Sequence, residues 1–229
     1  FGTESISLCL SSCKKIKNIS KVILATSTTN EDSILNNYLP KGVDIFYGDP
    51  DNVIKRYIDA AEKFNLDVVI RVTADCPFIS SEIAEILLKS HFNRGADYTA
   101  AKNFSVGTSC EIINLSALQK VANYFPDAEY SEYMTWYFKN NADHFDLNIV
   151  DLPADLIRDY RMTLDYKEDL VMFTKLFRKL DKDPVNIKNI FSILDKNPAI
   201  SDINQAIPLK YKSNKNLIRT LNKMTKITK

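Results

Sequence analysis

The 229-residue sequence lacks a net charge of either sign. It has 30 Lys and Arg residues against 29 Asp and Glu residues, so no overall field draws the protein toward nucleic acid or an anionic membrane. Long apolar runs are missing as well, since no segment approaches the roughly 20 apolar residues of a membrane-spanning helix. No pattern of a secretory signal peptide is found. These absences favour a cytoplasmic protein that binds neither nucleic acid nor membranes.

Cysteine and histidine are scarce. The four cysteines show no CxxC or Cys/His spacing typical of zinc sites, and we interpret them as reduced thiols. The two histidines, His91 and His144, lack the Ser or Cys and acid neighbours of a hydrolytic triad, so surface positions explain both. Cys76 follows an acidic residue, but a small semi-buried side chain is a simpler interpretation than a nucleophile.

The two ends of the sequence are unusual. It begins Phe1-Gly2-Thr3 without an initiator methionine and enters a helical pattern almost at once, so we expect a further segment to precede Phe1 in the gene product. Residues 210–229 contain seven Lys or Arg residues and no acid. A nucleic-acid arm is conceivable, but we favour a solvated basic tail, because apart from Tyr211 the stretch lacks the interleaved aromatic residues of a single-strand binder.

The sequence does contain a regular alternation of strand and helix patterns. Apolar runs at 21–26, 43–47 and 67–72 are each followed by a helical pattern, which predicts an α/β fold with a doubly wound, mostly parallel sheet. The run at 67–72 is the most apolar and predicts a strand buried on both faces. No internal repeat or low-complexity linker divides the chain, so we expect a single domain over 1–229.

The alternation is interrupted in the middle of the chain. Residues 96–157 predict a mixed excursion of strands and helices, which often forms an antiparallel flap or a subunit contact, although its aromatic residues could equally pack within the chain. The pattern at 160–164 predicts a return to the main sheet. Amphipathic helices are expected at 167–180 and 187–197.

An acidic residue follows the third predicted strand. Asp75 comes almost directly after the apolar run, and Pro77 then turns the chain away. In open parallel sheets, ligands bind beyond the carboxyl ends of the strands. A short acid at such a place can equally cap a turn, so spacing alone leaves both interpretations open.

A second acid, Asp165, also ends a predicted strand, where an N-cap for the next helix is the ordinary explanation. Mg²⁺ is usually held by one or two carboxylates together with substrate phosphates. Asp75 and Asp165 together could therefore hold a metal that arrives with a nucleotide. Arg56 and Arg71 are candidate phosphate or base contacts, because a guanidinium offers paired donors, although Arg56 could equally be an ordinary helix-surface arginine.

At these residues the sequence resembles the spore-coat polysaccharide type cytidylyltransferases. This group is related to the CMP-sugar synthetases for 3-deoxy-manno-octulosonate and to the acylneuraminate cytidylyltransferases. The matching residues, in chain order, are Ala25-Thr26-Ser27 with Asp32, 48–57, 71–77, Gly107 with Glu111, Tyr160-Arg161, Leu164-Asp165, Glu168-Asp169-Leu170, Asn197-Pro198 and Ile203-Asn204. The resemblance covers nearly the whole chain.

The resemblance implies a nucleotide-diphospho-sugar transferase-like fold in which 96–157 is a dimerisation excursion. It implies that CMP is transferred from CTP to a sugar or sugar acid for surface glycan synthesis, with Mg²⁺ as cofactor, pyrophosphate as product and a homodimer as assembly. The implied roles are catalysis and metal binding for Asp75 and Asp165, nucleotide binding for Ser27, Asp32, Arg56 and Arg71, and sugar binding for Gly107 and Glu111.

The sequence departs from the family at two places. The family opens with a strand and a basic loop resembling R-x-x-S-x-R-L-P-G-K that wraps the triphosphate, and this sequence does not contain them, which would severely impair catalysis by the chain. Tyr133 stands where the family often has a histidine. Two alternatives therefore stay open: a catalytically silent nucleotide-binding homologue, and a metal-dependent nucleotide-sugar glycosyltransferase, against which the missing D-x-D pair at Asp75 argues.

Overall fold

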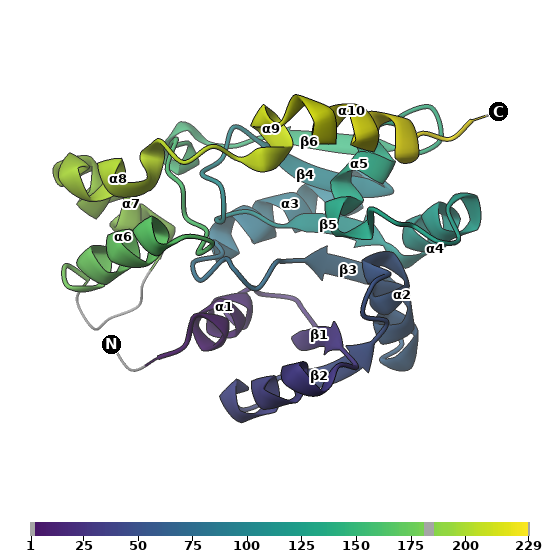
Figure 1. Cartoon of the computed structure of the whole chain (residues 1–229), viewed down its shortest axis with the longest axis horizontal. Helices are drawn as coiled ribbons and strands as arrows, with labels where there is room; N and C mark the ends of the chain where they lie inside the picture. The colour runs from purple at the N-terminus through teal and green to yellow at the C-terminus, as the bar shows by residue number, and fades with distance from the viewer. Residues whose placement is uncertain (1–2, 181–185, 229) are drawn as a thin grey trace.

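The computed structural model describes residues 3–180 and 186–228 and shows an α/β fold whose strands form two sheets (Figure 1). The smaller sheet pairs β1 (Ile23–Ser27) with β2 (Asp44–Gly48) in parallel. The larger sheet has four strands in the order β3, β5, β4, β6. Their bounds are Val68–Arg71 for β3, Glu111–Asn114 for β5, Tyr98–Lys102 for β4 and Leu147–Asp151 for β6.

One strand of the larger sheet runs against the others. Both β3 and β4 pair with β5 in antiparallel fashion, whereas β4 and β6 are parallel. It follows that β3, β4 and β6 share one direction and that β5, which comes from the predicted excursion, opposes them. The α/β class with mostly parallel strands is therefore confirmed, and the register places Arg71 opposite Glu111.

Helices connect these strands, and local capping explains several of their ends. The Asn52 side chain accepts from the backbone of Lys55 at the start of α2, and the Ser80 side chain accepts from Ile83 at the start of α3. The helices are α1 (Ser5–Cys13), α2 (Val53–Lys63), α3 (Ser81–Arg94), α4 (Leu115–Tyr124), α5 (Met134–Lys139), α6 (Lys167–Phe177), α7 (Ile187–Lys196), α8 (Pro198–Gln205), α9 (Lys210–Ser213) and α10 (Lys215–Met224), with 3₁₀ turns at Asn30–Tyr38, Ser131–Tyr133 and Ala154–Leu156.

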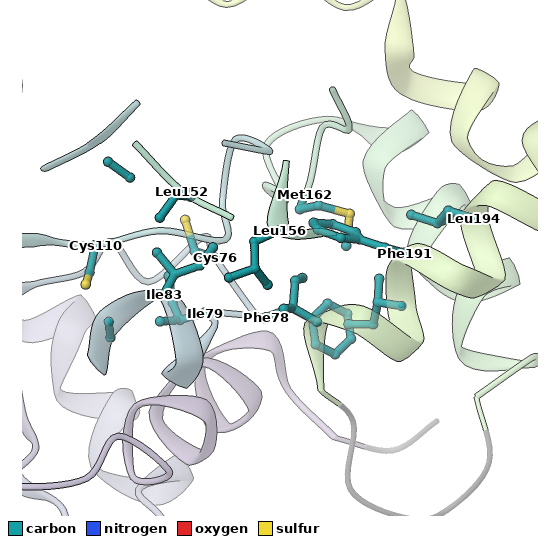
Figure 2. Close-up of a cluster of buried hydrophobic side chains, with 14 of the residues drawn as sticks. Cys76, Phe78, Ile79, Ile83, Cys110, Leu152, Leu156, Met162, Phe191 and Leu194 are labelled. Carbon is teal, nitrogen blue, oxygen red and sulfur yellow. The ribbon is translucent and has the colours of Figure 1, made fainter. Parts of the chain in front are cut away.

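The main hydrophobic core fixes the loops that follow β3 and precede α6. Figure 2 shows Cys76, Phe78, Met162 and Phe191 in this cluster, and all four side chains are buried. Cys76 is the residue after Asp75, and Met162 lies three residues before Asp165. Both predicted carboxylates thus extend from chain segments that are held by the core.

Three local predictions are wrong. Every residue of β3 is only partly buried, because this strand lies at the edge of its sheet. The segment 160–164 makes a single bridge, between Arg161 and Val106, rather than a strand of the main sheet. His91 is not at the surface: it is 2% exposed, and its ring nitrogens contact Thr99 Oγ1 at 2.9 Å and Asn114 Oδ1 at 3.0 Å.

Candidate functional site

A backbone hydrogen bond brings Asp75 and Asp165 together. The amide of Leu164 donates to the carbonyl oxygen of Asp75 at 2.9 Å, so the two aspartates stand one residue apart across this bond. The Asp165 side chain is 41% exposed. Among the described residues, the only donor to the Asp75 carboxylate is the thiol of Cys76, at 3.6 Å. The site therefore offers carboxylate oxygens that can accept a further ligand.

Arg161 and Asp169 hold Asp165 in place through hydrogen bonds. Arg161 donates to Asp165 Oδ2 at 2.5 Å and to Asp169 Oδ1 at 2.9 Å. Asp169 is fully buried and also accepts from the backbone amides of Asp165 and Tyr166, both at 2.9 Å, and from Asn204 at 2.8 Å. Burial alone would raise the pKa of Asp169, but these donors, led by Arg161, hold it below its usual range.

Gly107 shapes the loop that supports this segment. Its φ of +89° lies in the left-handed region, and a side chain at this position would overlap the backbone carbonyl of Met162. The neighbouring Val106 carbonyl accepts from the Met162 amide at 2.7 Å. Gly107 therefore contributes by allowing two backbones to approach each other just before Asp165.

Arg71 and Glu111 form an ion pair across β3 and β5. Arg71 Nη1 lies 2.6 Å from Glu111 Oε2, and each side chain is 14% exposed. Arg71 also donates to the backbone carbonyl of Glu132 at 3.1 Å, while Glu111 accepts from the hydroxyls of Tyr98 and Thr135. Burial alone would raise the pKa of Glu111, but Arg71 and the two hydroxyls bring it below its ordinary value. The structure thus joins a predicted nucleotide contact directly to a predicted sugar contact.

The end of β1 is organised by Asp32. Its Oδ2 accepts from Ser27 Oγ at 2.6 Å, from Thr26 Oγ1 at 2.7 Å and from the Ser27 amide at 3.0 Å. These hydrogen bonds, first those of the Ser27 and Thr26 hydroxyls, lower the pKa of Asp32. Asp32 therefore orders the loop after β1 as a charged acceptor. On α2, Arg56 donates to the carbonyl of Asp49 at 2.9 Å.

A cavity of about 1020 Å³ separates the two sheets. It is lined on one side by residues of β1 such as Leu24 and on the other by residues of β3 such as Val69. In the described part of the chain, both strands are edge strands that pair on one side only. Arg56 and Arg71 also line the cavity, and the buried Nε atom of each has no hydrogen-bond partner in the described chain. Buried donors of this kind are normally satisfied, so these two Nε atoms call for a partner that the described residues do not provide.

The donor set of the site fits a hard divalent cation. Asp75 and Asp165 offer carboxylate oxygens, which suit Mg²⁺ when phosphates and water complete the coordination. Within residues 3–180 and 186–228, no group of three or more His, Cys, Asp or Glu side chains could form an all-protein metal cage. Burial raises the pKa of the Cys76 thiol, which keeps it protonated and agrees with its interpretation as a packing residue. All four cysteines are free thiols.

The residues that sequence reasoning left without a role are those of the Arg161 network. Asp169 at the third position of α6 accepts from the helix-capping backbone amides, and an acid at this position is a recognised helix-start signal. That signal could have identified Asp169 as a positioning residue. The pairing with Arg161 has no comparable local signature.

The described helices include none that is long and apolar enough to cross a membrane.

Comparisons with known proteins find related sequences and structures over most of the chain. Residues 2–193 match the sequence model of a family described as cytidylyltransferase. An uncharacterized protein of Methanocaldococcus jannaschii is 31% identical over 208 residues, which cover 88% of this chain and 84% of that protein. The spore coat polysaccharide biosynthesis protein SpsF of Bacillus subtilis is 28% identical over 186 residues, which cover 80% and 78%. The structure of a cytidylyltransferase from Leptospira borgpetersenii serovar Hardjo-bovis has a TM-score of 0.80 at 26% identity, over 91% of this chain and 89% of that one.

Proposed function

The chain belongs to the cytidylyltransferase family and is therefore a nucleotidyltransferase, and we propose that it transfers CMP from CTP to a sugar or sugar acid with release of pyrophosphate. The observation that carries this proposal is the hydrogen bond from the Leu164 amide to the Asp75 carbonyl, which brings the segments of Asp75 and Asp165 side by side. Similarity to SpsF, named for spore coat polysaccharide biosynthesis, supports a role in surface glycan synthesis. No observation favours the glycosyltransferase alternative.

In this proposal Asp75 and Asp165 hold Mg²⁺. The cation, when bound, neutralises phosphate charge as the bond to pyrophosphate breaks. Asp165 is the better oriented of the two, because Arg161 and the Thr163 hydroxyl both donate to its Oδ2 at 2.5 and 2.9 Å. Asp75 has no such constraint and can turn toward the ligand.

The nucleotide lies toward the cavity in this proposal. The Nε donors of Arg56 and Arg71, which have no hydrogen-bond partner within residues 3–180 and 186–228, suit phosphate or base oxygens. Ser27 and Asp32 order the loop that follows β1, and β1 itself lines this space. Gly107 and Glu111 border the sugar side, where Glu111 fixes the orientation of Arg71 between the two substrates.

The test is a pyrophosphate-release assay of the full-length protein with CTP, Mg²⁺ and a panel of 2-keto sugar acids. We expect release with CTP and a suitable acceptor. Asp75→Asn and Asp165→Asn should each reduce the rate about 100-fold or more, because losing even an indirect partner of a metal ligand costs about 10–100-fold.

Asp146→Asn is the matched control. Asp146 is an aspartate in a surface ion pair with Arg94, and its side chain is 46% exposed, so its rate should equal that of the unmodified protein. An undiminished rate for Asp75→Asn would refute the metal assignment. Calorimetric binding of UDP-sugars in preference to CTP would refute the choice of substrate.

We further propose that the enzyme is a cytoplasmic homodimer whose contact lies in 96–157. Support comes from exposed apolar side chains in this excursion, such as Tyr124 and Ile149, each 45% exposed. Other aromatic residues of the excursion, such as Tyr137 and Phe138, are buried within the chain instead. Sedimentation should show a dimer that Ile149→Lys dissociates, and a monomer at all concentrations would overturn the assignment.

A further inference from the structure

Residues 131–135 of the excursion, termed the brace, are linked to both arginines of the cavity. The brace consists of a 3₁₀ turn and the first residues of α5. Two of its residues, Ser131 and Glu132, line the same cavity as Arg56 and Arg71. A hydroxyl at each end of the brace bonds to a group that holds one of these arginines.

At one end of the brace, Thr135 is linked to Arg71 through Glu111. The hydroxyls of Thr135 and Tyr98 both donate to Glu111 Oε1. The other carboxylate oxygen, Oε2, accepts from Arg71 Nη1 at 2.6 Å. The second terminal nitrogen of Arg71 donates to the Glu132 carbonyl of the brace at 3.1 Å. Because both terminal nitrogens are held, the guanidinium keeps one orientation, while its buried Nε has no partner among the described residues.

At the other end, Ser131 is linked to Arg56 through the turn that begins α2. The Ser131 side chain is buried. Its hydroxyl donates to the Asp51 carbonyl at 3.0 Å and accepts from the Val53 amide at 2.8 Å. Arg56 Nη1 donates to the carbonyl of Asp49 in the same turn at 2.9 Å. Ser131 thus fixes the turn that holds Arg56, whose buried Nε also lacks a partner in the described part of the chain.

The helix that carries Thr135 is anchored at its far end as well. The basic segment 210–229, expected to be a solvated tail, contains α9 and α10 (Figure 1). Just after α10, Thr225 is fully buried. Asn140 donates to the Thr225 hydroxyl at 2.8 Å, and Asn141 donates to its carbonyl at 2.7 Å. Because Asn140 directly follows α5, these bonds hold the helix, and with it the brace, in place.

We propose that Ser131 and Thr135 are positioning residues that hold Arg56 and Arg71 with their Nε donors toward the oxygens of one anionic ligand in the cavity. The inference rests on the proposed cytidylyl transfer and extends it, since the ligand is then the nucleotide. The hydrogen of each hydroxyl is already donated within the protein, so both residues act through the arginines and not by touching the ligand.

The first test compares Thr135→Val with Thr135→Ser in the full-length protein with Mg²⁺. Valine matches the shape of threonine but removes the hydroxyl, whereas serine keeps the donor to Glu111. We expect Thr135→Val to raise the calorimetric Kd for CTP about fivefold, the loss expected for one hydrogen bond. The KM for CTP should rise with it while kcat changes little, since uniform binding is lost. Thr135→Ser should restore the affinity of the unmodified protein.

Thr174→Val is the matched control for this helical threonine. Thr174 is also partly buried, and its hydroxyl donates to the Leu170 carbonyl within α6, so its loss should leave CTP binding unchanged.

The second test concerns the other end of the brace. Ser131→Ala should raise the Kd for CTP by a similar factor. Its control is Ser201→Ala, which also removes a buried serine hydroxyl, one that donates to the Pro198 carbonyl in α8. This control should bind CTP as tightly as the unmodified protein does.

A double-mutant cycle shows whether Thr135 acts through Arg71. Arg71→Gln removes the guanidinium that Glu111 orients, so adding Thr135→Val to it should cost little further affinity for CTP. If Thr135→Val binds CTP as Thr174→Val does, or if its effect adds in full to that of Arg71→Gln, this inference fails and the proposed function stands. An unmodified protein that neither binds CTP nor releases pyrophosphate overturns both.

Discussion

The two sides of the candidate site differ in how completely the chain builds them. On the carboxylate side, Asp165 is fixed by Arg161, and Arg161 is fixed by the fully buried Asp169. On the arginine side, Arg56 and Arg71 line a cavity of about 1020 Å³, and the buried Nε of each has no hydrogen-bond partner among the residues that the structure describes. The proposed metal side is therefore held by linked ion pairs around Asp165, whereas the arginine side still has donors to satisfy.

The strands repeat this contrast. The loop after β3 belongs to the main core and is tied to the segment before α6. Strands β1 and β2 instead form a two-stranded sheet of their own, an arrangement that is marginal without further packing. Mutations should consequently cost most where the site is interlocked and least where it is open.

The largest effect is expected at Asp169. Asp169→Asn removes the charge that pairs with Arg161 in the core, and breaking a buried ion pair costs about 3–5 kcal/mol. Because the folded-state pKa of Asp169 is lowered, its contribution is present above the ordinary carboxyl pKa of about 3.9 and is lost as the pH falls through the lower folded value. Urea unfolding between pH 7 and pH 3 should show that the free energy of unfolding falls less steeply with decreasing pH for the variant than for the unmodified protein. Identical slopes would contradict the assigned pairing.

Gly107→Ala should cost somewhat less, about 3 kcal/mol. The left-handed backbone contributes about 1–2 kcal/mol, and the overlap with the Met162 carbonyl adds the rest. Gly95→Ala is the matched control, because Gly95 has a φ of +69° but no atom within 4 Å of a side chain built there. Chemical denaturation should therefore show that Gly95→Ala loses only the free energy of unfolding that comes from placing alanine in a left-handed backbone conformation. Equal losses for the two variants would show that the close approach to Met162 is unimportant.

The carboxylate side was also the more predictable from sequence. Asp75 and Asp165 each follow a short apolar stretch, and the end of a strand is where ligands of α/β sheets bind, so local pattern pointed to both. The prediction of a strand at 160–164 is nevertheless wrong. Met162 is buried in the core and Leu164 packs against it, while the backbone of the segment bonds to Val106 and Asp75. An apolar pattern of this kind does not distinguish a strand from an extended loop.

The arginine side depended on long-range geometry that local patterns do not contain. Arg71 meets Glu111 because β5 runs antiparallel to β3 in one particular register. The apolar run at 67–72 predicts a strand buried on both faces, whereas β3 is only partly buried throughout and has one neighbouring strand in the described chain. His91 is buried because Thr99 and Asn114, from two other elements, satisfy its ring nitrogens.

Glu111→Gln should have an intermediate effect of about 2 kcal/mol, within the 1–3 kcal/mol cost of a buried group left unsatisfied. Glu111 pairs with Arg71, but each side chain keeps 14% exposure, and the adjacent cavity lets water reach Arg71 after the change. The folded-state pKa of Glu111 is lowered, so its contribution is likewise lost as the pH falls below the ordinary range near 4.3. If urea unfolding shows that Glu111→Gln loses as much free energy of unfolding as Asp169→Asn, the carboxylate side and the arginine side do not differ in how strongly they stabilise the fold.

The smallest effect on stability is expected at the residue that matters most to the proposed chemistry. Asp75 accepts one weak hydrogen bond, from the Cys76 thiol, and its backbone contact with Leu164 does not depend on the side chain. The free energy of unfolding of Asp75→Asn should therefore lie within about 0.5 kcal/mol of that of the unmodified protein. It should be slightly stabilised if removal of one charge relieves repulsion from Asp165. The measurement is urea unfolding without metal, followed by titration with CTP and Mg²⁺, in which only the unmodified protein should gain stability. Equal stabilisation of both proteins would show that Asp75 does not hold the metal, because a group that binds the ligand must change the response to it.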